Sequence, residues 1–210
     1  MTDDAQGVLA IWNDIRAERE ADFEFWYKTE HFPERLAVPG FRLGRRYEAV
    51  AGEPRYFCYY LTDTPEVLVS SAYLDRLSNP TAMTRQMMTG AFHNMSRTVC
   101  RRALRRGVLW GSIAVAVRFY DPIPESKHAL LDTLANADGV ARCELWLAAA
   151  QGAVMAEEAL RGGDRKIAGC LFVDTLRPAD AERVARQMEH EFGPKAEVGA
   201  YRLLCEIEAE

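Results

Sequence analysis

His31 is the residue of this chain best suited to acid–base chemistry. The pKa of imidazole lies near neutral pH, so the ring can take a proton from an acidic carbon or a phenol and return it. His31 follows Phe23 by eight positions and Tyr27 by four in a stretch predicted to be helical, which places the three on one helix face. Pro33 is predicted to break the helix just after it. The alternative is a histidine that caps the helix end by hydrogen bonding to a free carbonyl, and the sequence leaves both open.

Two arginines in predicted strands, Arg46 and Arg97, could bind a carboxylate or phenolate through the fork of donors in their guanidinium groups. Such a role requires a side chain that points into a cavity. The alternative is an outward charge on a solvated face, and it is favoured for Arg46. Glu30, beside His31, is predicted to face solvent because consecutive helix residues point about 100° apart.

Aromatic side chains could line a pocket for a flat ligand, and the candidates are Trp12, Trp26, Tyr27, Tyr47, Tyr59 and Phe92. Aromatic residues at strand or helix spacing usually belong to the core, and this is the interpretation for most of them. Trp12 and Tyr47 are favoured as pocket residues.

The elements that must position these residues occur in the same order twice. Strands are predicted at 8–15, 41–50, 55–62 and 92–102, and again at 112–120, 141–149, 166–175 and 197–207. Helical stretches are predicted at 22–30 with a turn to 38, at 65–77, 81–90 and 125–135, and from Pro178 onward. Within 112–120, hydrophobic residues alternate as in a half-buried strand. Each half of the chain therefore reads strand, helix, strand, strand, helix, strand.

Such a half forms a four-stranded antiparallel sheet with its helices on one face, so the other face must be covered. The sister half can cover it. The predicted fold class is α+β, with one βαββαβ unit at 1–107 and a second at 108–210.

The first half also resembles a known family. Its segment Asp22–Arg35 contains Trp26-Tyr27 and Glu30-His31-Phe32-Pro33, and Pro39-Gly40-Phe41 and Arg46-Tyr47 follow. This pattern is similar to that of the dimeric α+β barrel superfamily, especially its EthD-like members. The resemblance implies two tandem ferredoxin-like units packed sheet to sheet as an intramolecular α+β barrel. It also implies a small-molecule cavity in each half, between the sheet and its helices.

The second half departs from this pattern, with Ser126-Lys127-His128 at the corresponding place, so the site is expected in the first half. The superfamily includes cofactor-free monooxygenases, polyketide cyclases, lactone isomerases and haem-degrading enzymes, and fold membership alone selects none of them.

The resulting hypothesis is a cofactor-independent lyase, isomerase, cyclase or oxygenase acting on a small aromatic or polyketide-like substrate. Its catalytic residues are His31, Tyr47 and Arg97, and its substrate-binding residues are Trp12, Tyr27 and Arg46. The alternatives are a non-catalytic small-molecule binding protein, a haem-binding or haem-degrading protein with His31 as axial ligand, and a structural protein whose cavity is filled by its own side chains.

Composition argues against nucleic acid and membrane as partners, which leaves a small-molecule ligand as the expected partner. A net charge of −5 and a pI near 5.5 argue against general nucleic-acid binding, and no apolar run is long enough for a membrane span. The acidic start and the absence of paired cysteines favour a cytoplasmic protein with reduced thiols. The four histidines fall in different elements, so no metal site is expected, and association of two fused barrels into a homodimer is left open.

One segment is strongly basic despite the acidic total charge. It is predicted to form a salt-bridged surface facing an acidic partner element, and its members are Arg97, Arg101, Arg102, Arg105 and Arg106.

Overall fold

The strands of the protein close into a barrel. The computed structural model describes residues 5–149, 158 and 163–209, and within them the strand order is β1-β3-β2-β8-β5-β7-β6-β4, with each neighbouring pair antiparallel. The first half contributes β1 (Gly7–Ile15), α1 (Glu20–Trp26), α2 (Phe32–Leu36), β2 (Phe41–Ala51), β3 (Tyr56–Thr62), α3 (Ser71–Ser78), α4 (Ala82–Met88) and β4 (Phe92–Arg106). The second contributes β5 (Ile113–Phe119), α5 (Leu130–Ala135), β6 (Val140–Ala148), β7 (Gly169–Thr175), α7 (Pro178–Phe192) and β8 (Ala196–Glu208).

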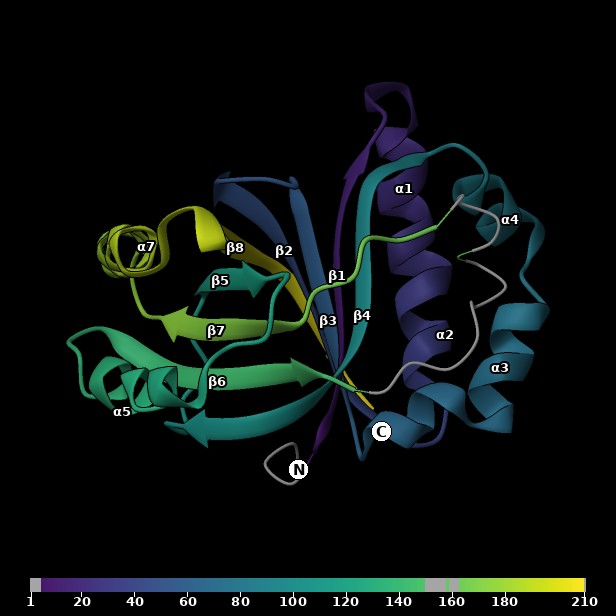
Figure 1. Ribbon diagram of the computed structural model, residues 1–210. Helices are drawn as coiled ribbons and strands as arrows, with labels where there is room; N and C mark the ends of the chain where they lie inside the picture. The colour runs from purple at the N-terminus through teal and green to yellow at the C-terminus, as the bar shows by residue number, and fades with distance from the viewer. Residues whose placement is uncertain (1–4, 150–157, 159–162, 210) are drawn as a thin grey trace.

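The two halves meet along two seams, where β2 pairs with β8 and β4 pairs with β6. Helices α1 to α4 cover one side of the barrel, while α5 and α7 cover the other (Figure 1). The expected α+β class, with strands of both halves enclosing a common interior, is confirmed. The boundary expected between residues 107 and 108 falls in the linker that joins β4 to β5.

The barrel interior is a core of its own, made by alternate residues of each strand. In β3, Phe57 and Tyr59 point into the barrel, while Tyr56 and Tyr60 face the helices. The interior is rich in aromatic rings: Trp12, Tyr47, Phe57, Tyr59, Trp146, Phe172 and Tyr201. Stacked pairs such as Trp146 on Phe172, with ring centroids 4.8 Å apart, fill the space.

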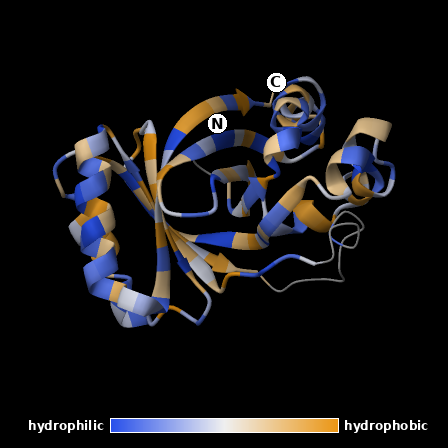
Figure 2. Cartoon of the chain, turned by 90° about the horizontal axis from the view of Figure 1, so that it is seen from above, coloured by the Kyte–Doolittle hydropathy of each residue, from blue (hydrophilic) through white to orange (hydrophobic). Residues whose placement is uncertain are grey.

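Strand β5 is buried on both faces, which corrects the expectation of a half-buried strand. Val115 and Val117 pack under the helices of the second half, and Ala114 and Ala116 face the aromatic interior. The helices outside are amphipathic. Figure 2 shows hydrophilic residues over much of the outer helix surface, with hydrophobic residues between helices and strands.

The sequence predicted that the helix carrying His31 would break at Pro33, but the helix continues past it. Helix α1 continues through a π-helical turn, Tyr27–His31, directly into α2, and the backbone keeps right-handed helical angles at His31 and Phe32. Pro33 lies in the first turn of α2, where proline's fixed φ is compatible with the helix and its missing N–H is tolerated. The helix therefore runs past His31 instead of ending there.

Two other predicted helices begin later than expected, after a short 3₁₀ segment. Pro65–Val69 precedes α3, which Ser70 caps by accepting from the Tyr73 N–H, and Glu125–Lys127 precedes α5. None of the helices in the described part of the chain is both long and apolar enough to cross a membrane.

Candidate functional site

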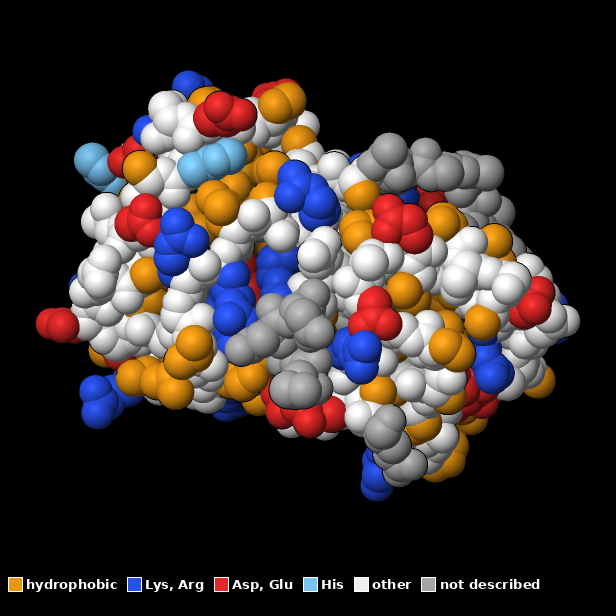
Figure 3. Space-filling view, turned by 90° about the horizontal axis from the view of Figure 1, so that it is seen from below, with side chains coloured by type: hydrophobic (Ala, Val, Ile, Leu, Met, Phe, Trp, Pro, Cys, Tyr) orange, Lys and Arg blue, Asp and Glu red, His pale blue; other side chains and the backbone are white. Residues whose placement is uncertain are grey.

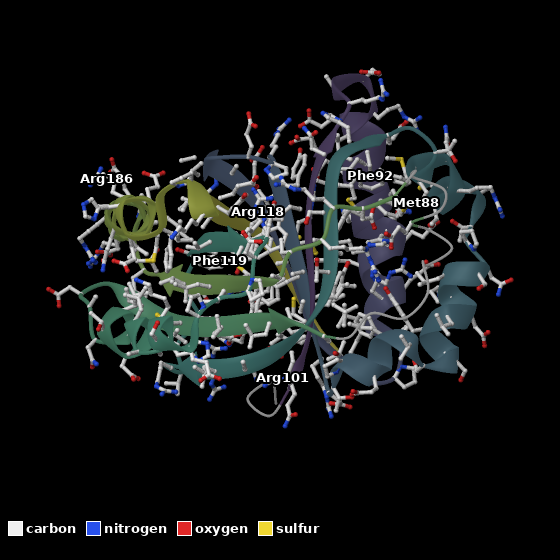
Figure 4. The ribbon with its side chains drawn as sticks, viewed as in Figure 1. Met88, Phe92, Arg101, Arg118, Phe119 and Arg186 are labelled. Carbon is white, nitrogen blue, oxygen red and sulfur yellow. The ribbon has the colours of Figure 1, made fainter. Side chains whose placement is uncertain are left out.

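A small buried cavity of about 30 Å³ lies between the outer face of the first-half sheet and the helices that cover it. His31 and Tyr27 reach it from the π-helical turn, and Arg97 reaches it from β4. Met88 and Phe92, both labelled in Figure 4, border it from the end of α4 and the start of β4. The space suffices for one or two water molecules. Three of the six predicted site residues therefore meet here.

The π-helical turn directs two rings of one helix toward the cavity. The ring centroids of Tyr27 and His31 lie 5.0 Å apart, and the His31 ring packs on Trp26 at 4.2 Å. His31 is buried. A π-helical turn widens the helix locally and often occurs at functional sites. The turn therefore places His31 against the sheet. Because the helix continues past this position, His31 does not cap a helix end.

Arg97 belongs to a buried polar cluster that sequence reasoning found only in part. Its Nη2 donates a hydrogen bond of 2.8 Å to the hydroxyl of Tyr73 on α3, and the Arg35 guanidinium lies 5.7 Å from the same ring. Arg35 and Tyr73 were missed. Arg35 follows His31 by four positions, a spacing that could have identified it. Tyr73 is distant in sequence and gave no local signal.

Glu30 was expected to face solvent, but it is half-buried. Its carboxylate accepts a 2.6 Å hydrogen bond from the Thr84 hydroxyl and another from Thr81. The Thr84 oxygen in turn accepts from the indole N–H of Trp26 at 2.9 Å. This chain of hydrogen bonds fixes the π-helical turn against α4 and so holds His31 in place.

Replacing Thr84 with valine is expected to lower the free energy of unfolding by about 1–3 kcal/mol, because the buried indole N–H of Trp26 loses its acceptor. Thermal unfolding followed by circular dichroism measures the change. Thr89→Val is the matched control, since Thr89 is exposed at the end of the same helix and bonds only within it. Equal melting temperatures for the two variants would contradict the role given to Thr84.

A larger groove of about 810 Å³ lies on the other side of Tyr27, between α1 and α2 and the neighbouring strand β8. Its apolar surface comes from Phe25, Phe32, Leu204 and Ile207. Tyr27 borders both this groove and the His31 cavity, so its ring forms the wall between them.

Tyr27 keeps its proton at neutral pH. Burial raises the pKa of the Tyr27 phenol well above its ordinary value, and the nearby Cys58 thiol adds to the shift. The side chain is therefore a neutral hydrogen-bond donor at the border between groove and cavity.

Arg46 is buried at the base of the groove, which corrects the expectation of an outward, solvated charge. Its guanidinium forms a bidentate pair with Glu24 at 2.7 and 2.5 Å and lies 4.5 Å from the Tyr27 ring centroid. Burial alone would lower the pKa of Arg46, but the hydrogen bonds to Glu24 outweigh it, and the pKa is raised. Arg46 thus holds α1 and Tyr27 against the sheet.

Trp12 and Tyr47 lie inside the barrel and do not meet His31. Both are fully buried and stack on Phe57, with centroid distances of 4.7 and 5.3 Å. Successive strand residues point to opposite faces, so Tyr47 faces the interior where Arg46 faces the helices. The sequence analysis placed Tyr47 and Trp12 in one site with His31. That prediction was wrong, because these two side chains lie on the opposite face of the sheet from His31.

The basic end of β4 meets acidic residues of the second half on more than one element. Arg106 pairs with Asp132 of α5 at 2.6 Å, whereas Arg102 pairs with the buried Glu144 of β6 at 3.3 Å. The Arg102 part of this predicted basic surface is therefore buried inside the protein. On the face seen from below in Figure 3, Lys and Arg side chains gather near the middle, with acidic side chains beside them.

Within the described residues, no cluster of three or more His, Cys, Asp or Glu side chains could hold a metal ion. Cys58, Cys100, Cys143 and Cys170 are buried free thiols, and burial raises the pKa of each. Cys205, on β8, is exposed.

Comparison with known proteins identifies the fold. No protein-family model and no curated protein sequence matches the chain. A candidate monooxygenase of Fusobacterium nucleatum has a similar structure, with a TM-score of 0.58, 10% identity, and coverage of 97% of this chain and 95% of that one. An anthrone oxidase-like protein has a TM-score of 0.58 and 11% identity, covering 99% and 94%.

A chlorite dismutase of Candidatus Nitrospira defluvii is also similar, with a TM-score of 0.51 and 9% identity, covering 94% of this chain and 92% of that one. The chain shares the fold of these neighbours. At such low identity the likeness extends to the fold alone.

Proposed function

We propose that this protein is a small-molecule enzyme that moves a proton at His31, without a cofactor, on a small aromatic or polyketide-like substrate such as a phenol. The observation that carries the proposal is the arrangement around Tyr27. On one side lies a groove lined by both apolar and charged side chains, and on the other lies a buried cavity bordered by His31 and Arg97.

The two spaces suit two parts of one molecule. The cavity of about 30 Å³ admits only the reacting end of a substrate, whereas the groove of about 810 Å³ has room for its body. Tyr27 borders both spaces, so a substrate that extends from the groove into the cavity has to displace its ring. Phe25 and Leu204 in the groove are exposed apolar side chains that a flat ligand would cover.

The chemistry at the inner end follows from the groups present. The His31 imidazole takes a proton from an acidic carbon beside a carbonyl or from a phenol. The negative charge that develops on the substrate oxygen is stabilised by the Arg97 guanidinium, which Tyr73 orients through its hydrogen bond. His31 then returns the proton to the same or another atom of the substrate, so no electrons are exchanged. The names of the neighbouring candidate monooxygenase and anthrone oxidase-like protein are compatible with a site for flat organic molecules.

The family assignment belongs to the same proposal. The chain is an EthD-like member in which residues 1–107 and 108–210 are tandem ferredoxin-like units, joined so that one polypeptide builds the barrel. The repeated order of strands and helices supports this division. The site is in the first unit.

A haem group does not fit the His31 site. The imidazole ring packs on Trp26 at 4.2 Å, and the adjoining cavity of about 30 Å³ is far smaller than a porphyrin. The residues that border the larger groove include no histidine within the described part of the chain. The mechanism therefore assigns no step to haem.

Thermal-shift screening against phenols, aromatic acids and lactones tests the binding part of the proposal. A compound at a hundredfold over its Kd stabilises the folded state by about 2.7 kcal/mol, which is readily measured. Arg97→Met is expected to abolish the shift. Tyr27→Ala, which joins groove and cavity, is expected to bind the same compounds more tightly. If no compound stabilises the wild type or Tyr27→Ala, a ligand site at this place is excluded.

Deuterium exchange tests the chemical part. In D₂O, wild-type protein is expected to speed the exchange of the acidic C–H of a bound ligand, followed by proton NMR, at least a hundredfold more than His31→Gln. His190→Gln is the control, because His190 is exposed on α7. A ligand that binds without any catalysed exchange would identify a binding protein, and exchange that persists in His31→Gln would remove His31 from the mechanism.

A further inference from the structure

The imidazole of His31 lies in surroundings that disfavour a positive charge. His31 is buried, and Arg35 of α2 and Arg97 of β4 border the same cavity. The described residues that line this cavity include no Asp or Glu. Burial and two nearby guanidinium groups both act against the protonated imidazole, which the proposed reaction must form. Another contact therefore has to stabilise that form.

The other titratable groups on the cavity wall are phenols, contributed by Tyr27 of the π-helical turn, Tyr60 of β3 and Tyr73 of α3. Burial raises the pKa of Tyr27 and of Tyr60 well above the ordinary value, so both stay neutral. The hydroxyl of Tyr73 already accepts a hydrogen bond from Arg97. None of these groups offers His31 a negative charge.

The indole of Trp26 is placed to hold a cation at His31. The ring centroids of Trp26 and His31 lie 4.2 Å apart with 34° between the ring planes, so the imidazole lies against the indole face. The rings of Tyr27 and Tyr60 are farther away, at 5.0 and 6.4 Å, and more steeply inclined. Among aromatic side chains, Trp attracts a cation most strongly, and the attraction grows where water is excluded. Trp26 is completely buried.

A carboxylate is linked to the same indole through a hydroxyl group. The indole N–H of Trp26 donates to Thr84 at 2.9 Å, and the Thr84 hydroxyl donates to Glu30 at 2.6 Å. Thr84 is 3% exposed, so these bonds form in a low-dielectric interior, where each hydrogen bond polarises the next. Because Glu30 draws the hydroxyl proton, the Thr84 oxygen becomes a stronger acceptor. The indole ring thereby gains negative charge on the face that contacts His31.

We infer that Trp26 and Glu30 are positioning residues that stabilise the protonated form of His31, Trp26 by contact and Glu30 by polarising the indole through Thr84. The inference rests on the proton transfer proposed above, because only a base that becomes protonated needs this support. In that step the proton moves from the acidic carbon or hydroxyl of the substrate to His31. The electron pair stays on the substrate oxygen beside Arg97, and the positive charge rests on the imidazole against Trp26.

Histidine titration by NMR tests the inference without any ligand. The imidazole C–H signals of ¹³C-histidine-labelled protein are followed from pH 5 to pH 9, and the signal absent from His31→Gln belongs to His31. Trp26→Phe keeps a ring but removes the N–H, and it is expected to lower the pKa of His31 by about 0.5 unit. Glu30→Gln keeps an oxygen that can accept from Thr84 and is expected to lower that pKa by about 0.3 unit.

The double variant identifies the route by which Glu30 acts. If Glu30 acts through the indole N–H, Glu30→Gln has little further effect on the pKa of His31 once Trp26→Phe has removed that N–H. The combined shift is then smaller than the sum of the two single shifts. A combined shift equal to the sum would mean that Glu30 acts on His31 directly, which overturns the route through Trp26.

Trp12→Phe is the matched control for Trp26→Phe, because Trp12 is equally buried but lies inside the barrel. Asp22→Asn is the control for Glu30→Gln, because Asp22 is a carboxylate of α1 that is 60% exposed. Both controls should leave the pKa of His31 unchanged. Glu30→Gln keeps the test valid if Trp26→Phe does not fold.

The inference is overturned if Trp26→Phe or, in its place, Glu30→Gln titrates like the wild type, or if His31 of the wild type takes up no proton above pH 5. These measurements also separate the inference from the proposed function, because they need no substrate. Shifted pKa values without catalysed exchange in D₂O would reject the proposed function alone. Catalysed exchange with unshifted pKa values would reject the role of Trp26 and Glu30 alone.

Discussion

Replacing Arg45 with methionine is expected to lower the free energy of unfolding by about 3–5 kcal/mol at pH 8, the cost of leaving one member of a buried ion pair without its partner. Arg45 lies on β2, points into the barrel and is 2% exposed. Its Nη1 is 3.2 Å from the carboxylate of Asp174, which is completely buried on β7. Urea unfolding of the two proteins measures the difference.

The loss is large because Arg45 joins several parts of the molecule. It also pairs with Glu206 at 2.7 Å, donates from Nη2 to the Gly111 carbonyl at 2.9 Å, and lies 4.8 Å from the Trp110 ring. Gly111 and Trp110 belong to the linker between the halves. Methionine fills a similar volume but makes none of these polar contacts.

Arg42→Met on the same strand is the matched control. Arg42 pairs with Asp63 at 2.5 Å, but both side chains are 43% exposed, so the pair contributes less than about 1 kcal/mol. If Arg42→Met and Arg45→Met lost the same stability, burial would not be what makes the interior pair important.

The fold could be predicted because it follows from local patterns. Alternation in strands such as 112–120 and the repeated order of elements indicated two sheets that had to cover each other, and the barrel resulted. The prediction of a break at Pro33 was wrong, since a π-helical turn, which single-residue propensities do not reveal, carries the helix past it.

The site was predictable only where its residues lie on one helix, or on alternate positions of one strand and so on the same face of the sheet. Tyr27 and His31 are four apart on one helix, and their common face was expected. Tyr47 follows Arg46 directly, so the two could never have faced the same pocket, and strand alternation alone excluded the pairing. The contact of Arg97 with Tyr73 joins a strand to a helix packed on it, and the pairing of Arg45 with Asp174 crosses from one half to the other. Such contacts depend on the closed barrel and have no local signature.

Wild-type protein is expected to lose stability as the pH rises from about 4 to about 7, a change that Asp174→Asn should abolish. Burial raises the pKa of Asp174 from 3.8 to about 7, although Arg45 opposes the shift. Between these two values the folded state holds a proton on Asp174 that the unfolded chain has released. Since the folded state then binds more protons, the free energy of unfolding falls with rising pH through this window and levels off above it.

The expected fall is about 4 kcal/mol, because each unit of pKa difference corresponds to about 1.4 kcal/mol. Urea unfolding at pH 4.5, 6 and 8 should detect about 3 kcal/mol of this fall, because at pH 4.5 part of the change has already occurred. The value is taken as the difference between wild type and Asp174→Asn, so that the contributions of other carboxylates cancel. Asp132→Asn, which removes a carboxylate that is 60% exposed, should retain the wild-type slope. Parallel profiles for wild type and Asp174→Asn would mean that the interior carboxylate stays ionised through this range. The Arg45 pair would then act as a permanent ion pair, and the loss in Arg45→Met would be as large at pH 5 as at pH 8.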